Sequence, residues 1–189
     1  MSIKSRLSKF LFITLRIEKY KILSTCRRVT GKPLLQQPLL LVGTGSIVFK
    51  NNVQIGVKYS PKYYSGYSYI EARGEASQIL IGNNVSINNG FAAVALSAII
   101  IDNNVLIGES CSILDTDGHF LPADMRNNYN PPAAGVHIKE NVFLGSNVVI
   151  LKGVTIGQNS IIGNSSVVTK SIPANVVAAG NPARIIRNL

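Results

Sequence analysis

The sequence predicts an all-β chain folded as a parallel β-helix, a prism with flat faces, with an N-terminal helical segment before it and a short C-terminal helix after it. Three observations support this fold class. An aliphatic residue returns every six positions through the second half of the chain, and asparagine pairs recur between repeats. The 189 residues also include no Trp and only 7% aromatic residues. Small aliphatic side chains must therefore fill a narrow, regular interior, because large rings usually fill layered cores.

The chain divides into a basic helical segment (residues 1–32), a repeat domain (residues 33–179) with a projecting loop (residues 115–135), and a C-terminal tail (residues 180–189). The formal net charge is +10, and the basic segment carries most of it, with nine Lys or Arg residues against one acidic residue, Glu18. The positive charge thus belongs to this segment and not to the repeats. Such a cluster favours a polyanionic partner, either a nucleic acid or an anionic membrane.

The apolar residues of the basic segment favour a membrane. On a helical wheel, one side collects Ile3, Leu7, Phe10, Leu11, Leu15, Ile17 and Ile22, and the other collects Arg6, Lys9, Arg16 and Lys19. Phe12 and Ile13 break this division. A basic amphipathic helix is typical of the membrane interface, whereas the chain shows no nucleic-acid reading motif. We expect peripheral membrane contact through residues 1–28 and no nucleic-acid partner; a helix packed on its own domain or on a neighbouring subunit is the alternative.

The six-residue recurrence sets the fold of the repeat domain. The aliphatic positions are Ile138, Leu144, Ile150, Ile156, Ile162 and Val168, and earlier Ile81, Ile87, Ala93, Ile101, Ile107 and Ile113. Four residues after an aliphatic position the side chain is usually small or β-branched, as at Val142, Val148, Val154, Ser160 and Ser166. A period of six fits neither a helix nor a simple alternating strand. It fits a prism in which each face is a short strand and each corner a turn, with three faces to a coil and coils about 4.8 Å apart.

Asparagine and cysteine fit the same scheme. The asparagine pairs at residues 51–52, 83–84 and 103–104 suit corners, because asparagine tolerates left-handed backbone angles. Cys111 occupies a small-residue position of the repeat, and Cys26 is the only other cysteine. Two such cysteines make neither a disulfide framework nor a metal site, and they favour a reduced, cytoplasmic setting.

The recurrence stops after Ile113 and resumes at Ile138, and this interruption carries the candidate chemistry. It contains Asp115-Thr116-Asp117-Gly118-His119 and then a Pro- and Asn-rich loop. Irregular backbone cannot join a ladder of strands, so the loop must project from the prism. His119 thereby lies beside two carboxylates, and an imidazole with a carboxylate on its second ring nitrogen is the arrangement of a general base. Asp115 and Asp117 are both candidates for that carboxylate, and either can instead cap the loop.

Other polar and aromatic residues carry weaker signals. His137, the second of two histidines, precedes Ile138 in a regular repeat and is expected on the outside of a coil or at a subunit contact. A β-helix hydratase of the γ-carbonic anhydrase kind needs three histidines around its metal, so we expect no metal site. Five tyrosines crowd into residues 59–69; they either line a sugar site or cover the end of the prism, and covering is the preferred interpretation.

The repeats resemble a known family. The pattern of aliphatic residue, glycine, two variable residues and a small residue is similar to that of the hexapeptide-repeat acetyltransferases. The stretch VFLGSNVVILKGVTIGQNSIIGNSSVVTKSIPANVVAAGNPARIIR, from Val142 to Arg187, together with residues 79–119, resembles the galactoside and maltose acetyltransferase type, and also polysaccharide O-acetyltransferases. The resemblance covers about half of the chain and implies a left-handed β-helix. Residues 1–45 carry little of it.

The resemblance also implies roles for individual residues. Members of this family carry their catalytic histidine on the loop that holds His119, and Asn88 matches an asparagine that assists acyl transfer by hydrogen bonding. The matching cofactor positions, along the coils and between subunits, are Phe143, Gly145, Ser146, Asn164, Thr169, Lys170, Arg184 and Arg187. Asn164 departs from the family's usual alanine, so its side chain is expected to point away from the thiol. On a C-terminal helix, Arg184 and Arg187 would share one face.

The activity implied is that of an acetyl-CoA-dependent O-acetyltransferase that works as a homotrimer on a sugar hydroxyl. The basic segment suggests a lipid-linked glycan acceptor at the cytoplasmic face of a membrane, in the synthesis of O-antigen, capsule or exopolysaccharide. Two alternatives stay open. One is an acetyltransferase for serine or for a nucleotide sugar, and the other is a non-catalytic β-helix that binds or scaffolds.

Overall fold

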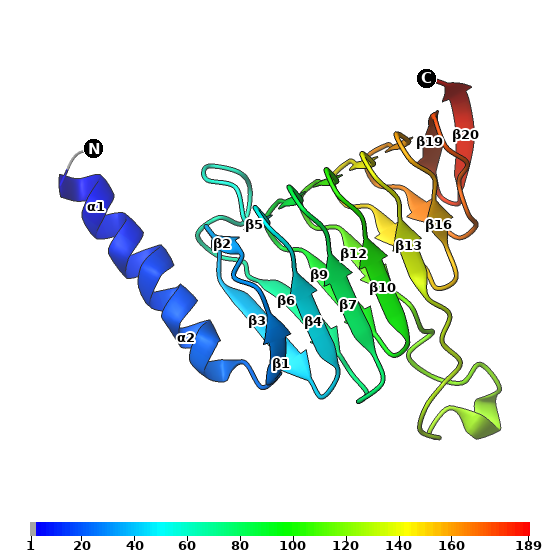
Figure 1. Ribbon diagram of the computed structural model, residues 1–189, viewed down its shortest axis with the longest axis horizontal. Coiled ribbons are helices and arrows are strands. Elements are labelled where there is room, and N and C mark those ends of the chain that lie inside the picture. Colours follow the sequence, from blue (N-terminus) through cyan, green and yellow to red (C-terminus); the bar gives the residue numbers. More distant parts are fainter. Residues whose placement is uncertain (1–2) are drawn as a thin grey trace.

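The computed structural model describes residues 3–189, which form the predicted left-handed parallel β-helix with a helix at its N-terminal end (Figure 1). Residues 1–2, the start of the predicted basic segment, lie outside the described residues. The strands make three sheets, and the chain visits them in turn, so that each sheet forms one face of the prism. We call the faces A, B and C in the order in which the chain reaches them, and name each edge by the two faces that it joins.

Most strands are short, because each face lasts only until the next corner. Face A holds β1 (Arg28–Thr30), β4 (Ser46–Phe49), β7 (Gln78–Ile81), β10 (Ala98–Ile101), β13 (Val136–Ile138) and β16 (Thr155–Ile156). Face B holds β2 (Leu34–Leu35), β5 (Gln54–Ile55), β8 (Ser86–Ile87), β11 (Leu106–Ile107), β14 (Phe143–Leu144), β17 (Ile161–Ile162), β19 (Val176–Gly180) and β20 (Ala183–Asn188). Face C holds β3 (Leu39–Gly43), β6 (Ser68–Ala72), β9 (Ala92–Ala95), β12 (Ser112–Leu114), β15 (Val149–Ile150) and β18 (Val167–Val168).

The interior is one continuous column of aliphatic side chains, as the period predicts. Ile138, Leu144, Ile150, Ile156, Ile162 and Val168 are all fully buried, and so are the earlier positions from Ile81 to Ile113. The small-residue positions face inward too, including Cys111. In register, Ile81 stacks beside Ile101 and Ile101 beside Ile138, so each coil covers the apolar residues of the previous one. This mutual coverage stabilises a fold that no single coil could form.

The A/B edge is built from asparagine ladders. Asn52, Asn84 and Asn104 adopt φ near +58°, the left-handed conformation that asparagine tolerates. Their side chains connect coil to coil: Asn52 donates to Asn84, and Asn84 donates to Asn104, both at 3.1 Å. The predicted corner role of these pairs is confirmed.

Two long loops leave the prism at different edges. Residues 56–67, which hold most of the tyrosines, join β5 to β6 at the B/C edge. Residues 115–135, which hold His119 and the short 3-10 helix η2 (Ala123–Met125), join β12 to β13 at the C/A edge. In Figure 1 the first loop lies at the top of the prism and the second at the bottom.

The N-terminal helix comprises α1 (Ile3–Lys9), the π-helical turn η1 (Phe10–Thr14) and α2 (Leu15–Leu23). Ile13 is buried, and the guanidinium of Arg16 donates to the carbonyl oxygens of Tyr64, Ser65 and Gly66. Arg16, predicted on the solvent-facing basic side, therefore anchors the helix to the tyrosine loop. The helix ends at Leu23 and β1 begins at Arg28, so residues 28–32 belong to the prism and not to the helical segment as predicted. Within residues 3–189, none of the helices is long and apolar enough to cross a membrane.

The predicted C-terminal helix is wrong. Residues Ala183–Asn188 form β20, which pairs antiparallel with β19 after a turn at Gly180, where φ is +107°. The open edge of face B offers unpaired backbone groups, and these favour a strand over a helix for a short terminal segment. A bulge in the register places Arg184 opposite Ala179 and Arg187 opposite Val177, two positions on the same face of β19. The two arginines therefore share one side for a different reason from the one predicted.

Candidate active site

His119 lies in a hollow at the C/A edge. The loop of residues 115–135 folds back over two earlier coils and borders an open hollow of about 470 Å³. The cavity is lined by Arg73, Gly74, Leu96, Gly118, His119, Arg126, Asn127, Asn128, Tyr129, Asn130 and Pro131. One part of the wall thus comes from the prism and the other from the loop.

The ring of His119 is fixed by a backbone carbonyl. Its Nδ1 atom lies 3.0 Å from the carbonyl oxygen of Arg126. A carbonyl oxygen can only accept, so Nδ1 carries the hydrogen and donates it. In the neutral ring Nε2 is then left with its lone pair, which is the state required of a general base.

The two candidate carboxylates have other partners. Asp115 is buried, and its two oxygens accept the backbone N–H groups of Leu96 and Ser97, both at 2.7 Å. Burial raises the pKa of Asp115, an effect that outweighs these hydrogen bonds. Asp117 forms an ion pair with Lys152. In the described part of the chain neither carboxylate hydrogen-bonds the imidazole, so both act on the base of the loop instead.

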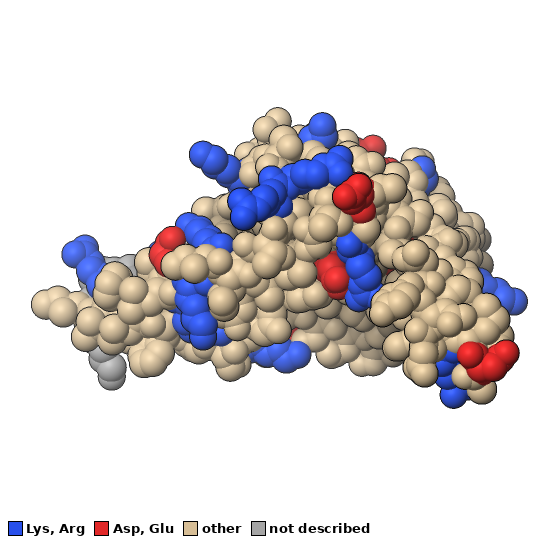
Figure 2. Space-filling view, turned by 90° about the horizontal axis from the view of Figure 1, so that it is seen from below, with Lys and Arg blue, Asp and Glu red and all other residues tan. Residues whose placement is uncertain are grey.

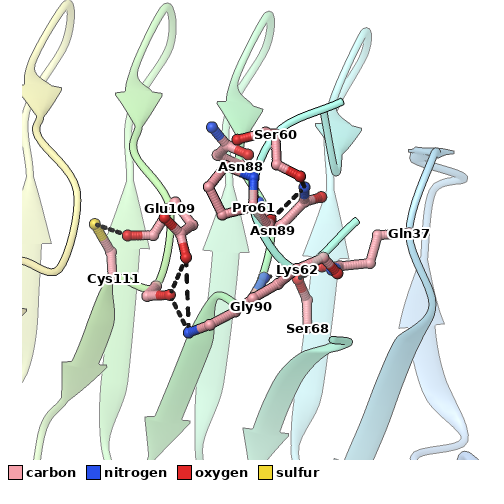
Figure 3. Close-up of polar contacts among 11 residues, drawn as sticks. Gln37, Ser60, Pro61, Lys62, Ser68, Asn88, Asn89, Gly90, Glu109 and Cys111 are labelled. Carbon is pink, nitrogen blue, oxygen red and sulfur yellow. Dashed lines mark hydrogen bonds and ion pairs between the residues drawn. The ribbon is translucent and has the colours of Figure 1, made fainter. Parts of the chain in front are cut away.

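Asn88 lies at a different edge, B/C, directly after β8 (Figure 3). Its side-chain oxygen accepts the N–H of Asn89 at 2.7 Å, which turns the chain at this corner. Its neighbour Asn89 was not singled out from the sequence, yet it is fully buried and holds the tyrosine loop. The Asn89 amide donates to the carbonyl oxygens of Val57 and Pro61, both at 2.9 Å.

A second group of polar residues pins the same loop beside Asn88. The ammonium of Lys62 hydrogen-bonds Ser110 and lies 3.7 Å from a carboxylate oxygen of Glu109 (Figure 3). The buried Gln37 donates to the carbonyl of Lys62 at 3.0 Å and accepts the N–H of Gly90 at 2.9 Å. The sequence does give a signal here, because Gln36 and Gln37 interrupt an otherwise apolar run between residues 34 and 42. The tyrosine loop therefore lies along the B/C edge, with Tyr63 buried and Tyr59 exposed.

The predicted cofactor positions divide between the two edges. Gly145, Ser146 and Asn164 lie at the B/C edge, where the Asn164 side chain accepts the N–H of Ser146 at 2.9 Å. That side chain turns back over Gly145, and a Cβ at Gly145 would lie 2.2 Å from its oxygen. Thr169 and Lys170 lie exposed at the C/A edge. Phe143, Arg184 and Arg187 lie exposed on face B.

The single chain thus does not bring the predicted site together. His119, Thr169 and Lys170 share the C/A edge, whereas Asn88, Ser146 and Asn164 share the B/C edge. Face C separates the two groups in every coil.

Other reactive groups are held in structural roles. Burial raises the pKa of the Cys111 thiol to about 11, and this thiol contacts the carbonyl oxygen of Gly145 at 3.0 Å. His137 lies on the outer side of face A, with Nε2 3.0 Å from Asp102. Within residues 3–189, no group of three His, Cys, Asp or Glu side chains is placed to hold a metal ion.

Comparison with known proteins agrees with this architecture. Residues 135–170 match the model of the bacterial transferase hexapeptide family (six repeats). Galactoside O-acetyltransferase from Escherichia coli K12 is 44% identical over 113 residues, which cover 60% of this chain and 55% of that protein. A second protein of the same organism, described as "putative lipopolysaccharide biosynthesis O-acetyl transferase WbbJ", is 31% identical over 162 residues, 82% of this chain and 78% of its own.

Solved structures give the same result. A galactoside acetyltransferase in complex with coenzyme A has a TM-score of 0.59 at 37% identity, covering 74% of this chain and 65% of that one. A hexapeptide-repeat acetyltransferase from Vibrio cholerae, complexed with acetyl coenzyme A, has a TM-score of 0.58 at 33% identity, covering 65% and 64%. The chain spans 55–61% of the length of the first three curated relatives that it matches. The repeats, the three-faced prism and these likenesses show that the chain belongs to the hexapeptide-repeat acetyltransferase family.

Proposed function

We propose that this protein transfers the acetyl group of acetyl-CoA to a hydroxyl of a sugar, with His119 as the general base. One observation carries the proposal: His119 faces a hollow large enough for a sugar, and its tautomer leaves Nε2 free. The relatives named as galactoside and lipopolysaccharide O-acetyltransferases support it. Because the chain covers only part of the galactoside enzymes, the activity is inferred from the site and not carried over from them.

The chemistry follows from the position of the imidazole. Nε2 of His119 takes the proton of the acceptor hydroxyl while that oxygen attacks the thioester carbonyl, and the acyl C–S bond then breaks. The imidazolium returns its proton to the departing sulfur, so the base is regenerated and the products are an O-acetyl sugar and free thiol. General base catalysis of this kind contributes about 10²–10⁴-fold. Asn88 would donate to the oxyanion that forms on the thioester oxygen.

The division of the site between two edges supports a trimer. We infer that the C/A edge of one protomer, with His119, faces the B/C edge of the next, with Asn88 and Ser146. Such a contact joins two different surfaces of the same chain, and it closes into a ring when the rotation is threefold. Every seam of the homotrimer would then hold one complete site.

Acetyl-CoA would lie along this seam. Its phosphates are polyanionic, and Lys170, Arg184 and Arg187 are exposed cations near the C-terminal coils. Arg184 and Arg187 lie on the same side of β20 and so present two guanidinium groups together. Such groups bind phosphate well, because each offers several donors in a fixed plane. The exposed ring of Phe143 would pack on the pantetheine arm, with Gly145, Ser146, Asn164 and Thr169 along the same path.

The N-terminal helix suggests where the acceptor resides. Its large apolar side chains are mostly exposed, including Leu7, Phe10, Leu11 and Leu15. Lys and Arg side chains lie over this end of the molecule and continue onto the prism (Figure 2). An exposed helix with apolar and basic residues binds the surface of an anionic membrane. A lipid-linked glycan at the cytoplasmic membrane face, as in cell-surface polysaccharide synthesis, is the acceptor that this arrangement favours.

The decisive experiment is an acetyl-transfer assay. The purified protein is incubated with radiolabelled acetyl-CoA and a panel that contains lipid-linked glycans, soluble galactosides, nucleotide sugars and serine. Transfer to a glycan hydroxyl is expected. Label transferred only to serine or to nucleotide sugars would overturn the acceptor assignment, and the absence of any acceptor-dependent release of free thiol would overturn the activity itself.

A further inference from the structure

Cationic side chains line the hollow around His119. Two arginines, Arg73 from the prism and Arg126 from the loop, line it. Among its lining residues, all within the described part of the chain, none carries a carboxylate. Neither aspartate at the base of the loop is among these lining residues: Asp115 is buried against the N–H groups of Leu96 and Ser97, and Asp117 is paired with Lys152. A hollow with this lining attracts an anion.

Side chains on the outer side of face C hold the guanidinium of Arg73 in one orientation. Its Nε and one terminal nitrogen each lie 3.0 Å from an oxygen of Glu71, in a two-pronged ion pair. The hydroxyl of Tyr69 donates a hydrogen bond to the same carboxylate at 3.0 Å, and this contact further restrains the Glu71 side chain. Burial by itself raises the pKa of Glu71, but Arg73 and Tyr69 outweigh it and lower this pKa below its ordinary value; Glu71 in turn raises the pKa of Arg73. Both groups are therefore charged.

The ion pair with Glu71 does not use all the N–H donors of Arg73. A guanidinium has five N–H groups, and Glu71 takes two of them within the described residues. The other three remain for a ligand in the hollow. Because Glu71 is only 14% exposed while Arg73 is 44% exposed, the carboxylate lies behind the guanidinium and the cation faces solvent.

We propose that the acceptor bears an anionic group, a carboxylate or a phosphate, which Arg73 binds while the neighbouring sugar hydroxyl reaches His119. The inference rests on the proposed acetyl transfer and narrows its acceptor to acidic sugars, such as a uronic acid or a phosphosugar. Arg73 is then a specificity-determining residue: it selects the acceptor and sets its register against the imidazole. Arg126, whose backbone carbonyl accepts from His119, adds a second cation from the loop side of the wall.

The test compares acidic acceptors with uncharged counterparts. Initial rates of acetyl transfer are measured with p-nitrophenyl β-D-glucuronide and with its methyl ester, and separately with glucose 6-phosphate and glucose. The ratio of kcat/KM within each pair reports recognition of the anion, and the two pairs distinguish carboxylate from phosphate. Hydrogen bonds to charged groups are strong enough that the preferred acid should exceed its neutral partner about tenfold or more.

Three variants make the test specific. Arg73→Met should bring the ratio of kcat/KM within the preferred pair close to one, because the acid loses the cation that binds it. The double variant Glu71→Gln/Arg73→Met should do the same, and it removes the objection that an unpaired Glu71 repels the acid. Lys50→Met, which deletes an exposed cation at the A/B edge, should leave the ratio unchanged.

Failure of this inference differs from failure of the proposed function. Equal rates within both pairs, transfer to neutral acceptors alone, or a ratio that survives Arg73→Met would overturn the anionic acceptor while acetyl transfer stands. If no acceptor in either pair or in the wider panel is acetylated, the proposed function falls, and this inference falls with it.

Discussion

Nδ1 of His119 and the carbonyl oxygen of Arg126 lie 3.0 Å apart, within one loop. The contact fixes the tautomer of the ring, as a carboxylate does in a catalytic triad, but it brings no negative charge to stabilise the imidazolium. The loop itself is thus the orienting element of the proposed base. Its anchors, Asp115 and Asp117, act on the position of the ring through the backbone.

The first prediction concerns His119 itself. His119→Ala should lower the rate of acetyl transfer at least a hundredfold, because the acceptor hydroxyl loses its base. The side chain is exposed, so the midpoint of thermal unfolding should change little. Asp117→Asn should cost less than about tenfold, far less than the loss of the aspartate in a serine-protease triad. A loss of similar size in both variants would show that a carboxylate supports the imidazole after all.

The second prediction tests the seam between protomers. His119→Ala and Asn88→Ala are each expected to be nearly inactive, but the substitutions lie on different edges. A mixed trimer then contains one seam with both residues intact, so trimers purified through a different tag on each variant should recover about a third of the wild-type rate. A matched mixture of His119→Ala and His119→Gln restores no seam and should stay inactive. Recovery that does not exceed this control would place the whole site within one protomer.

The third prediction separates the two aspartates of the loop by stability. Asp115→Asn replaces one accepting oxygen with an NH₂ group, so one of the buried N–H groups of Leu96 and Ser97 loses its acceptor. We expect a loss of about 1–3 kcal/mol in the free energy of unfolding, against about 0–1 kcal/mol for Asp117→Asn, whose ion pair is partly exposed. Urea denaturation of both variants measures the difference. Equal losses would contradict the anchoring role of Asp115.

The pKa of Asp115 adds a pH dependence to this comparison. Burial raises this pKa in the folded protein above its ordinary value of 3.8, so folding favours the protonated form. The resulting stabilisation is fully present below the unfolded pKa and is lost as pH rises through the folded pKa. The stability advantage of the wild type over Asp115→Asn should therefore shrink between about pH 4 and the neutral range. An advantage that grows over the same range would reverse the sign assigned here.

The fourth prediction concerns Cys111. With a pKa of about 11, its thiol is protonated at neutral pH, and it is buried in the column of the prism. Iodoacetamide should therefore leave Cys111 unmodified in the native protein and label it after denaturation, as mass spectrometry of tryptic peptides can show. Rapid native labelling at Cys111 would indicate that the coil opens or that the thiol has a chemical role.

These residues also show how far the sequence alone could lead. The interior was predictable because burial repeats every six residues. At each inward position, as at Ile138, Leu144 and Ile150, the aliphatic residue type by itself indicates that the side chain is buried. The edges were predictable in principle: Asn88 follows a strand of face B and the loop of His119 follows a strand of face C, so counting three repeats per coil separates them.

Contacts that depend on backbone atoms or on distant segments were not predictable. The acceptor of the His119 ring is a carbonyl, which no side-chain pattern reveals. On a helical wheel, Arg16 lies on the side that is expected to face solvent. In the structure its guanidinium instead donates to three carbonyl oxygens of the tyrosine loop. The spacing of Arg184 and Arg187 is compatible with a helix. Their segment forms a strand because it can pair with the open edge of face B, which the sequence pattern does not reveal.

The last prediction tests the membrane proposal without dismantling the fold. Deletion of residues 2–28 would remove Ile13 and Arg16, which anchor the helix to the prism. Substitutions at exposed positions therefore test membrane binding more specifically than the deletion does. Leu7→Asp together with Leu11→Asp adds charge to the exposed apolar side and should reduce sedimentation with liposomes rich in anionic lipid, because transfer of both leucines to the interface is lost. Leu121→Asp, at an exposed leucine of the loop of residues 115–135, is the matched control and should bind as the wild type does. If the helix variant binds liposomes as well as this control, the apolar side of the helix contacts another protein surface, most simply a neighbouring protomer, and the acceptor need not be lipid-linked.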